Sequence, residues 1–258
     1  MQQDNRQPAC REMLVSEDRI FTPNYREEFP LPDGRRLRLR LGKPDDREML
    51  LEAFGELSPE SRYTRWGYAK THLTDDEIER LATADGDNDL PLAAIELYPS
   101  GRERAGAGLA RFVRDPDDPS TAEISLTVVD EWQGQGVGRL LLDRLLAAMA
   151  EAGVRRARGR MLAANEPMRR LIARYAEPGD FWSDGPATEF EFTVPALIDT
   201  PATLAARGAR GLIRAGREAA TRVISTPLRF AEDVLGRRIA RKRQSAMHDR
   251  SAPREQRP

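Results

Sequence analysis

The chain has 258 residues, of which 40% are hydrophobic and 32% are charged, and its formal net charge is −1 at pH 7. This composition fits one medium globular domain with appendages, or two small domains. A single cysteine, Cys10, excludes a disulfide framework, and two distant histidines, His72 and His248, are too few for a typical zinc site. Because the sequence has no long apolar run and no secretion-signal pattern at its start, we expect a cytoplasmic protein.

The charges are distributed unevenly along the chain. Residues 1–198 contain 27 Lys and Arg against 36 Asp and Glu, whereas residues 199–258 contain 14 against 6. An acidic body with a basic tail suggests a separate role for the tail. We therefore divide the chain into a flexible N-terminal arm at 1–33, a globular domain at 34–197 and a basic, partly amphipathic helical tail at 198–258.

The first half of the domain combines one alternating segment with several helical ones. The RLRLRL segment predicts a strand at 36–41. Proline and acids at 44–46 favour the start of a helix that reaches Phe54. The segment LSPESRYTRW then indicates a second helical turn and a loop, and Thr74 with Glu77 has the spacing of a capping box at the start of a further helix.

The second half alternates strands and helices around a central apolar helix. The leucine stripe of 137–151 predicts that helix, with Gly153 beyond its end. The other elements expected are strands at 91–98, 105–114 and 121–129, a strand at 154–162, a helix at 165–175, and closing strands at 179–183 and 187–194. The order predicts an α/β protein with antiparallel strands before the central helix.

A glycine-rich loop, DEWQGQGVGRLLL at 130–142, joins a strand to this helix. Alternating glycines let the main chain approach a ligand closely, and amides at a helix N-terminus bind phosphate. A Walker loop is excluded because no Lys-Ser/Thr follows, and Gly134, Gly136 and Gly138 are one residue short of a dinucleotide fingerprint. The pattern Q-x-x-G-x-G, beginning at Gln133, fits instead. A tight turn without a ligand is the alternative.

Three blocks of the sequence together resemble one family. The loop with its flanks, VVDEWQGQGVGRLLLDRLL, resembles the acetyl-coenzyme A loop of the GNAT superfamily of N-acetyltransferases. With it, LSPESRYTRW at 57–66 and ANEPMRRLIAR at 164–174 resemble segments of bacterial protein lysine acetyltransferases of the Pat type, in the same order. The resemblance covers about 31–195 and implies the GNAT fold, an α+β fold with a mixed, mostly antiparallel sheet flanked by helices.

The resemblance also implies acetyl-CoA as cosubstrate and no metal. The strand before the loop is implied to be bulged and to diverge from its neighbour, so that its free main chain binds the pantetheine arm. Amides of the loop would hold the pyrophosphate, aided by the helix dipole. The implied coenzyme-binding residues are Thr127, Val128, Val129, Gln133, Gly134, Gln135, Gly136, Val137, Gly138, Arg139 and Asn165.

Transfer to an amine needs the amine neutral, so a general base is expected. Strand alternation places Glu123 on one face with the small polar residues Ser125 and Thr127. Glu123 also stands ten residues before Gln133, the spacing at which related protein acetyltransferases carry their base. A charged residue on a solvated strand face is the alternative, and Glu96 or the Asp130–Glu131 pair are weaker candidates.

Three further features keep two interpretations each. Asn165 either only caps its helix or also contacts the coenzyme. Ile172 stands where many relatives have a leaving-group tyrosine, and Tyr175 is a packing residue in preference to an acid. The segment of alternating arginines and aromatics is one that lines the acceptor entrance in this superfamily; the alternative is that these residues pack with their charged ends in solvent. They are Arg62, Tyr63, Arg65 and Trp66.

The leading hypothesis is therefore an acetyl-CoA-dependent N-acetyltransferase that acts on a primary amine, foremost a protein lysine. A small-molecule amine acetyltransferase and a non-catalytic acyl-CoA-binding module are the alternatives. The tail at 198–258 is expected to contact an anionic membrane, nucleic acid or an acidic protein surface, or to be solvated.

Overall fold

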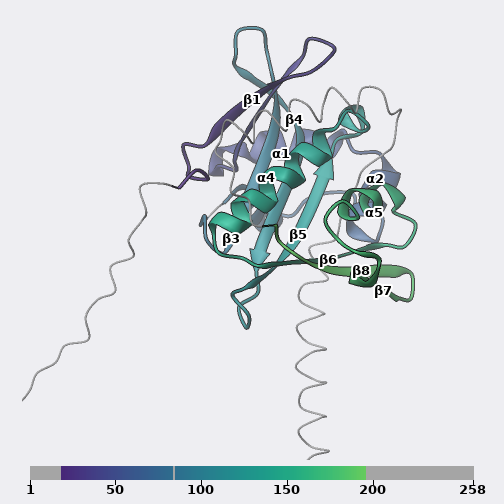
Figure 1. Ribbon diagram of the computed structural model, residues 1–258. Coiled ribbons are helices and arrows are strands. Elements are labelled where there is room, and N and C mark those ends of the chain that lie inside the picture. The colour runs from purple at the N-terminus through teal and green to yellow at the C-terminus, as the bar shows by residue number, and fades with distance from the viewer. Residues whose placement is uncertain (1–18, 84, 196–258) are drawn as a thin grey trace, which may run out of the picture.

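The computed structural model describes residues 19–83 and 85–195, which form one eight-stranded sheet with helices on both sides (Figure 1). The basic tail expected at 198–258 lies outside the described residues. In chain order the elements are β1 (Arg26–Pro30), β2 (Arg36–Leu41), η1 (Pro44–Asp46), α1 (Arg47–Gly55), α2 (Pro59–Trp66), α3 (Asp75–Ala82), β3 (Asp89–Leu97), β4 (Glu103–Arg114), β5 (Thr121–Val128), η2 (Asp130–Trp132), α4 (Val137–Glu151), β6 (Arg156–Leu162), α5 (Glu166–Ile172), η3 (Pro178–Asp180), β7 (Phe181–Asp184) and β8 (Ala187–Thr193).

The strand order is β1-β2-β3-β4-β5-β6-β8-β7, and neighbouring strands are antiparallel except for the parallel pair β5 and β6. This arrangement confirms the expected mixed, mostly antiparallel sheet. The parallel pair requires a crossover, which α4 provides. The two strands therefore point their carboxyl ends toward the same edge of the molecule.

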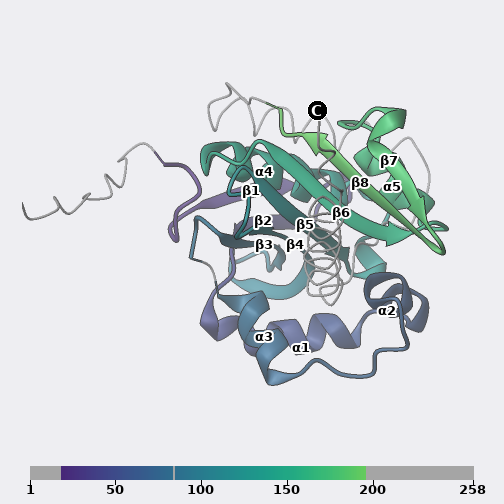
Figure 2. The ribbon, with the colours of Figure 1, turned by 90° about the horizontal axis from the view of Figure 1, so that it is seen from below.

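Helices cover both faces of the sheet, as the view from below shows: α4 and α5 lie on one side and α1, α2 and α3 on the other (Figure 2). Alternation along β5 assigns its side chains to these two layers. Ile124, Leu126 and Val128 join the main core with the leucines of α4, whereas Glu123, Ser125 and Thr127 face the other way. A second, smaller core joins α1, α2 and α3.

The central helix α4 has the bounds that the leucine stripe predicts. Gly153 follows its end with φ +78°, and its amide donates to the carbonyl oxygen of Ala150, while the Val154 amide bonds to Met149. These bonds satisfy carbonyl groups that a helix end leaves open. The capping box also forms as expected, because the Thr74 hydroxyl accepts from the Glu77 amide and the Glu77 carboxylate accepts from the Thr74 amide.

The N-terminal arm expected at 1–33 is too long. Residues 26–30 form β1, which pairs antiparallel with β2, and Phe21, Tyr25 and Phe29 are buried in the main core. The segment REEFP contains one large apolar residue, Phe29, and prolines stand at 30 and 32. Its sequence alone therefore does not predict a strand. Its pairing instead depends on β2 and on contacts with α4, where Arg144 donates to the Glu27 carboxylate at 2.7 and 2.9 Å.

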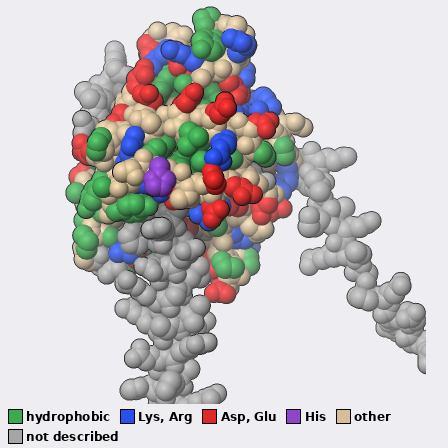
Figure 3. Space-filling view, turned by 180° about the vertical axis from the view of Figure 1, so that it is seen from behind, with side chains coloured by type: hydrophobic (Ala, Val, Ile, Leu, Met, Phe, Trp, Pro, Cys, Tyr) green, Lys and Arg blue, Asp and Glu red, His purple; other side chains and the backbone are tan. Residues whose placement is uncertain are grey.

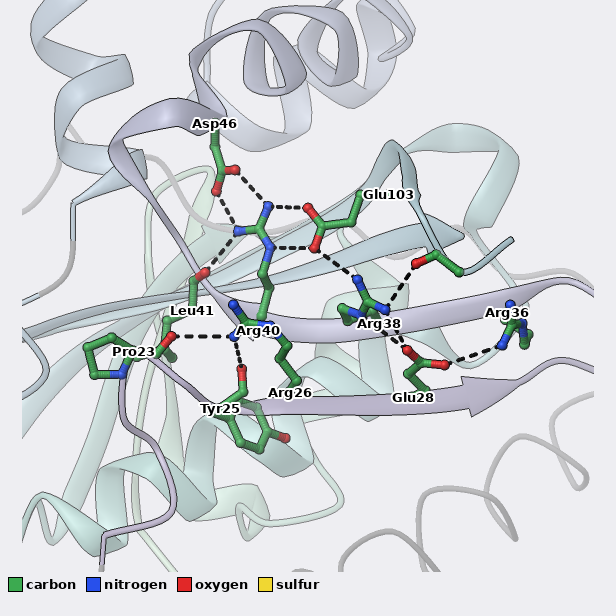
Figure 4. Close-up of polar contacts among 11 residues, drawn as sticks. Pro23, Tyr25, Arg26, Glu28, Arg36, Arg38, Arg40, Leu41, Asp46 and Glu103 are labelled. Atoms are coloured by element: carbon green, nitrogen blue, oxygen red, sulfur yellow. Dashed lines mark hydrogen bonds and ion pairs between the residues drawn. The ribbon is translucent and has the colours of Figure 1, made fainter. Parts of the chain in front are cut away.

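A buried ion-pair network holds the start of α1 on the sheet (Figure 4). The Arg40 guanidinium on β2 is 1% exposed and donates two hydrogen bonds of 2.7 Å to Asp46. It also binds Glu103 on β4 at 2.9 and 2.8 Å. Hydrogen bonds from Arg40 lower the pKa of Glu103 to about 2. The network fixes η1, which takes the first turn of the helix that the sequence predicts from Pro44.

Candidate active site

Strands β5 and β6 form a fork. They pair only over Thr121–Glu123 and Arg156–Arg158, so that Glu123 lies opposite Arg158 at the last paired position. Beyond this point the pairing of β5 with β6 ends, whereas its pairing with β4 continues to Val128. A strand that has parted from its neighbour in this way can take a linear ligand along that edge.

The divergence expected for this strand is present, but the bulge is not in β5. Its register against β4 is continuous from Ala122 to Val128. The irregularities lie one strand further, between β3 and β4, where the pairing passes from Gly108 directly to Gly106. Bulges of this kind are common next to active sites.

The glycine loop turns β5 into α4 with two glycines in the left-handed region. Gly134 has φ +73° and Gly136 has φ +87°, and Gly136 is the N-cap of α4. At Gly134 and Gly136 the backbone conformation itself favours glycine, which agrees with the alternative of a tight turn without a ligand. Gly138, by contrast, lies inside α4, where any residue fits the backbone. The first amides of α4, from Val137 to Arg139, have no partner within the helix and form the positive end of its dipole.

Side chains of the loop bind it to the strand end and to α2. Gln133 Nε2 donates to the Val128 carbonyl at 3.0 Å and to Asp130 Oδ1 at 2.9 Å. Asp130 in turn accepts from the Ser58 amide at 3.1 Å and from the Ser61 hydroxyl. The SPES segment thus anchors the start of α2 beside the loop, a contact that sequence reasoning missed.

A second anchor comes from the β1–β2 turn. Arg35 donates to Glu131 and to Gln135 Oε1, both at 2.8 Å, and its guanidinium stacks 3.9 Å from the centroid of the Trp132 ring. Arg139 at the start of α4 lies 3.7 Å from the Asp143 carboxylate. Sequence reasoning also missed Arg35, because about 100 residues separate it from its partners and no local pattern links them.

Glu123 lies at the closed end of the fork, and the pKa of its carboxyl group is raised. Burial raises the pKa of its carboxyl to about 7, against the opposing charges of Arg158 and Arg65. A carboxylate with a pKa near 7 is well suited to accept a proton at neutral pH. The other candidates for this role already accept hydrogen bonds: Glu96 pairs with Arg104 at 3.0 Å, Asp130 accepts from the Ser58 amide, and Glu131 accepts from Arg35.

Two of the predicted residues lie in and just after the last helix, α5. The Asn165 side chain accepts from the Met168 amide at 3.1 Å and so caps α5, which ends at Ile172. Tyr175 lies beyond the helix, where its hydroxyl donates to Asp143 and its ring stacks on Phe192. Burial raises the pKa of Tyr175 above its ordinary value, so this hydroxyl is held as a packing and bonding group.

A cavity adjoins the fork on the side of α1, α2 and α3. It contains about 780 Å³ of space not filled by the protein, part of it open to solvent. Thr127 and Ser125 of β5 form one wall, and Arg65 and Trp66 of α2 contribute to another. Arg65 is 3% exposed and donates from Nε to the Thr127 hydroxyl at 2.8 Å.

Diverging strands, a glycine turn at a helix N-terminus and a carboxylate where the strands part lie together, an arrangement suited to a transferase that uses an acyl-coenzyme A. The comparisons with known proteins agree: the family model "Acetyltransferase (GNAT) domain" matches residues 36–175, more than half of the chain. The chain belongs to the GNAT acetyltransferase family, an N-acetyltransferase family whose domain uses acetyl-CoA.

Individual relatives point to the same family. The acetyltransferase Pat of Mycolicibacterium smegmatis is 38% identical over 65 residues, which are 25% of this chain and 20% of that protein. The acetyltransferase PA5475 of Pseudomonas aeruginosa is 26% identical over 141 residues, or 55% of this chain and 74% of the relative. The solved GNAT domain of S. lividans PAT, 25% identical, covers 65% of this chain and 96% of that structure with a TM-score of 0.56. The chain thus matches only a fifth of the M. smegmatis protein.

Two observations concern the wider setting of the site. No helix in the described part of the chain has the length and hydropathy to cross a membrane. Residues 19–83 and 85–195 also bring together no group of three or more His, Cys, Asp or Glu that could hold a metal ion.

Proposed function

We propose that this protein transfers the acetyl group of acetyl-CoA to a primary amine, foremost a protein lysine, with Glu123 as the general base. One observation carries the proposal: a carboxyl group with a pKa of about 7 lies where β5 and β6 separate. The amine nitrogen attacks the thioester carbonyl, Glu123 accepts the proton that the nitrogen loses, and the C–S bond breaks to release coenzyme A as a thiolate.

The residues of the fork fit the coenzyme. The pantetheine arm would lie along the end of β5, beside Thr127, Val128 and Val129, where β6 has diverged. The loop amides and the start of α4 suit its pyrophosphate, and these residues are Gln133, Gly134, Gln135, Gly136, Val137, Gly138 and Arg139. Asn165, at the end of the other arm of the fork, completes the proposed coenzyme-binding set.

The surface over α1 and α3 supports a lysine-bearing protein as acceptor. Exposed acidic residues follow α1 at Glu48, Glu52 and Glu56, and others lie at the start of α3. Figure 3 shows the side opposite to that of Figure 1, where acidic side chains gather beside basic and hydrophobic ones. The negative charge of the acidic residues on α1 and α3 attracts a lysine-rich surface and speeds its encounter with the site.

Incubation with labelled acetyl-CoA and proteins of a cell lysate tests the proposal. The expected result is label on lysine side chains, found by mass spectrometry of the labelled bands. Glu123→Gln run beside the wild-type protein controls for non-enzymatic acetylation. Label on a polyamine or another small amine, with none on protein, would show that the acceptor is a small molecule. Tight acetyl-CoA binding with no label on any amine would show that the protein is a non-catalytic binding module.

A further inference from the structure

The cavity under α1 exists because the sheet carries small residues there. Its floor is formed by Ala93, Ala94, Gly106, Ser125 and Thr127, all of which contribute to the lining. Larger apolar side chains surround this floor, from Met49, Leu50, Phe54, Leu57, Leu73 and Leu109. An added Cβ at Gly106 would come within 3.2 Å of the Ala53 methyl group on α1, so even one carbon would tighten the space.

Two residues of α2 that line this cavity each have a buried donor without a hydrogen-bond partner. Arg65 Nη1 and Trp66 Nε1 are both buried, and neither has a hydrogen-bond partner. Both residues line the cavity, at 3% and 6% exposure. A buried donor without a partner is destabilising, and native proteins contain few of them. A pair at one cavity therefore suits a ligand that brings acceptor oxygens.

The charge balance around Arg65 favours an anion. Burial, together with the positive charge of Arg111, lowers the pKa of Arg65 to about 9. Glu123 and Glu77 are the acids whose charges act on Arg65, and Glu77 is already bonded to Lys70 at 2.9 Å. A guanidinium binds a carboxylate with two parallel hydrogen bonds, which is the strongest neutralisation available to it.

We propose that this cavity binds a short aliphatic chain that ends in a carboxylate, with the carboxylate on Arg65 and Trp66 and the chain against the apolar walls. The inference rests on the proposed function, because the cavity adjoins the place where thioester and amine would meet. The carboxylate has two possible sources. It belongs either to the acyl group of a dicarboxylic acyl-CoA or to an acceptor amine.

Two pairs of matched substrates, measured with the full chain, separate these sources. In the donor arm, kcat/KM and the calorimetric Kd for succinyl-CoA are compared with those for butyryl-CoA. In the acceptor arm, 5-aminopentanoate is compared with pentylamine, with acetyl-CoA as donor. We expect the compound with a carboxylate to be preferred at least 10-fold in one arm, since a hydrogen bond to a charged group contributes about 1.5–3 kcal/mol, or roughly 10- to 150-fold.

Variants then assign the preference to Arg65. Arg65→Gln removes the charge and Arg65→Lys retains it without the planar fork, so the preference should fall toward 1 in the first and to an intermediate value in the second. Arg47→Gln is the matched control, because Arg47 pairs with Asp75 on the exposed side of α1. Each preference is the ratio of kcat/KM for the compound with a carboxylate to kcat/KM for the matched compound without one, measured in the same variant. A general loss of activity therefore cancels from the ratio. Thermal melts verify that each variant is folded.

The wild-type protein alone can overturn the inference. No preference for the carboxylate in either arm contradicts it, as does a preference that Arg65→Gln leaves unchanged. If acetyl-CoA binds and reacts while no carboxylate preference exists, only this inference fails. If acetyl-CoA neither binds nor reacts, the proposed function fails, and this inference fails with it.

Discussion

The two faces of the sheet are built in opposite ways. Toward α4 the sheet is packed with large apolar side chains, so that Leu126 and Leu142 are almost fully buried. Toward α1, α2 and α3 the contacts include buried charges, such as the Arg40–Asp46 pair, and a cavity lies over small residues. Close packing on one face stabilises the fold, whereas the other face keeps unfilled space. The proposed acceptor site therefore lies on the less densely packed face.

The largest expected effect concerns Glu123, on the face with the cavity. Glu123→Gln should lower kcat by about 10²- to 10⁴-fold, the usual contribution of a general base, and leave the Kd for acetyl-CoA unchanged. Calorimetry and a coupled thiol-release assay measure the two quantities. Glu96→Gln is the control, because Glu96 pairs with Arg104 away from the fork. Unchanged turnover in Glu123→Gln would remove this residue from catalysis.

Removing a side chain should cost more stability on the α4 face than on the face with the cavity. Leu142→Ala removes a fully buried side chain of α4 and should lower the free energy of unfolding by about 2–5 kcal/mol. Leu50→Ala on α1 removes a partly buried side chain that already borders the cavity, so a loss of about 1 kcal/mol is expected. Urea denaturation of both variants gives the comparison. Equal losses would mean that the two faces are equally well packed.

A smaller effect is expected at the glycine turn on the side of α4. Gly138→Ala adds a methyl group inside the first turn of the helix, where it improves helix propensity by about 1 kcal/mol. It should nevertheless raise the Kd for acetyl-CoA about 10-fold, because a Cβ there keeps the pyrophosphate from the amides. Gly179→Ala is the control, since a Cβ at Gly179 has no neighbour within 4 Å. Undiminished affinity in Gly138→Ala would show that the glycines serve only the turn.

The sequence predicts the features that local patterns encode. The leucine stripe predicts α4 to the residue, and strand alternation places Glu123 on the face of Ser125 and Thr127. The β1 strand was not predicted, because its pairing depends on β2 and on Arg144 in a distant helix. The divergence of β5 from β6 was expected from family resemblance alone. The raised pKa of Glu123, the Arg35 contacts and the cavity arise only from tertiary packing, which no local pattern reports.

The most direct test of Glu123 as the base is the pH dependence of kcat/KM for acetyl transfer. A base must be deprotonated, and burial raises the pKa of Glu123 to about 7, so kcat/KM should fall as the pH drops below this value. A lysine acceptor adds its own rise toward pH 10, and this rise should remain in Glu123→Gln. The account predicts an inflection near pH 7 in the wild-type protein that is absent from the variant. An inflection that persists in Glu123→Gln, or a wild-type profile without one, would contradict it.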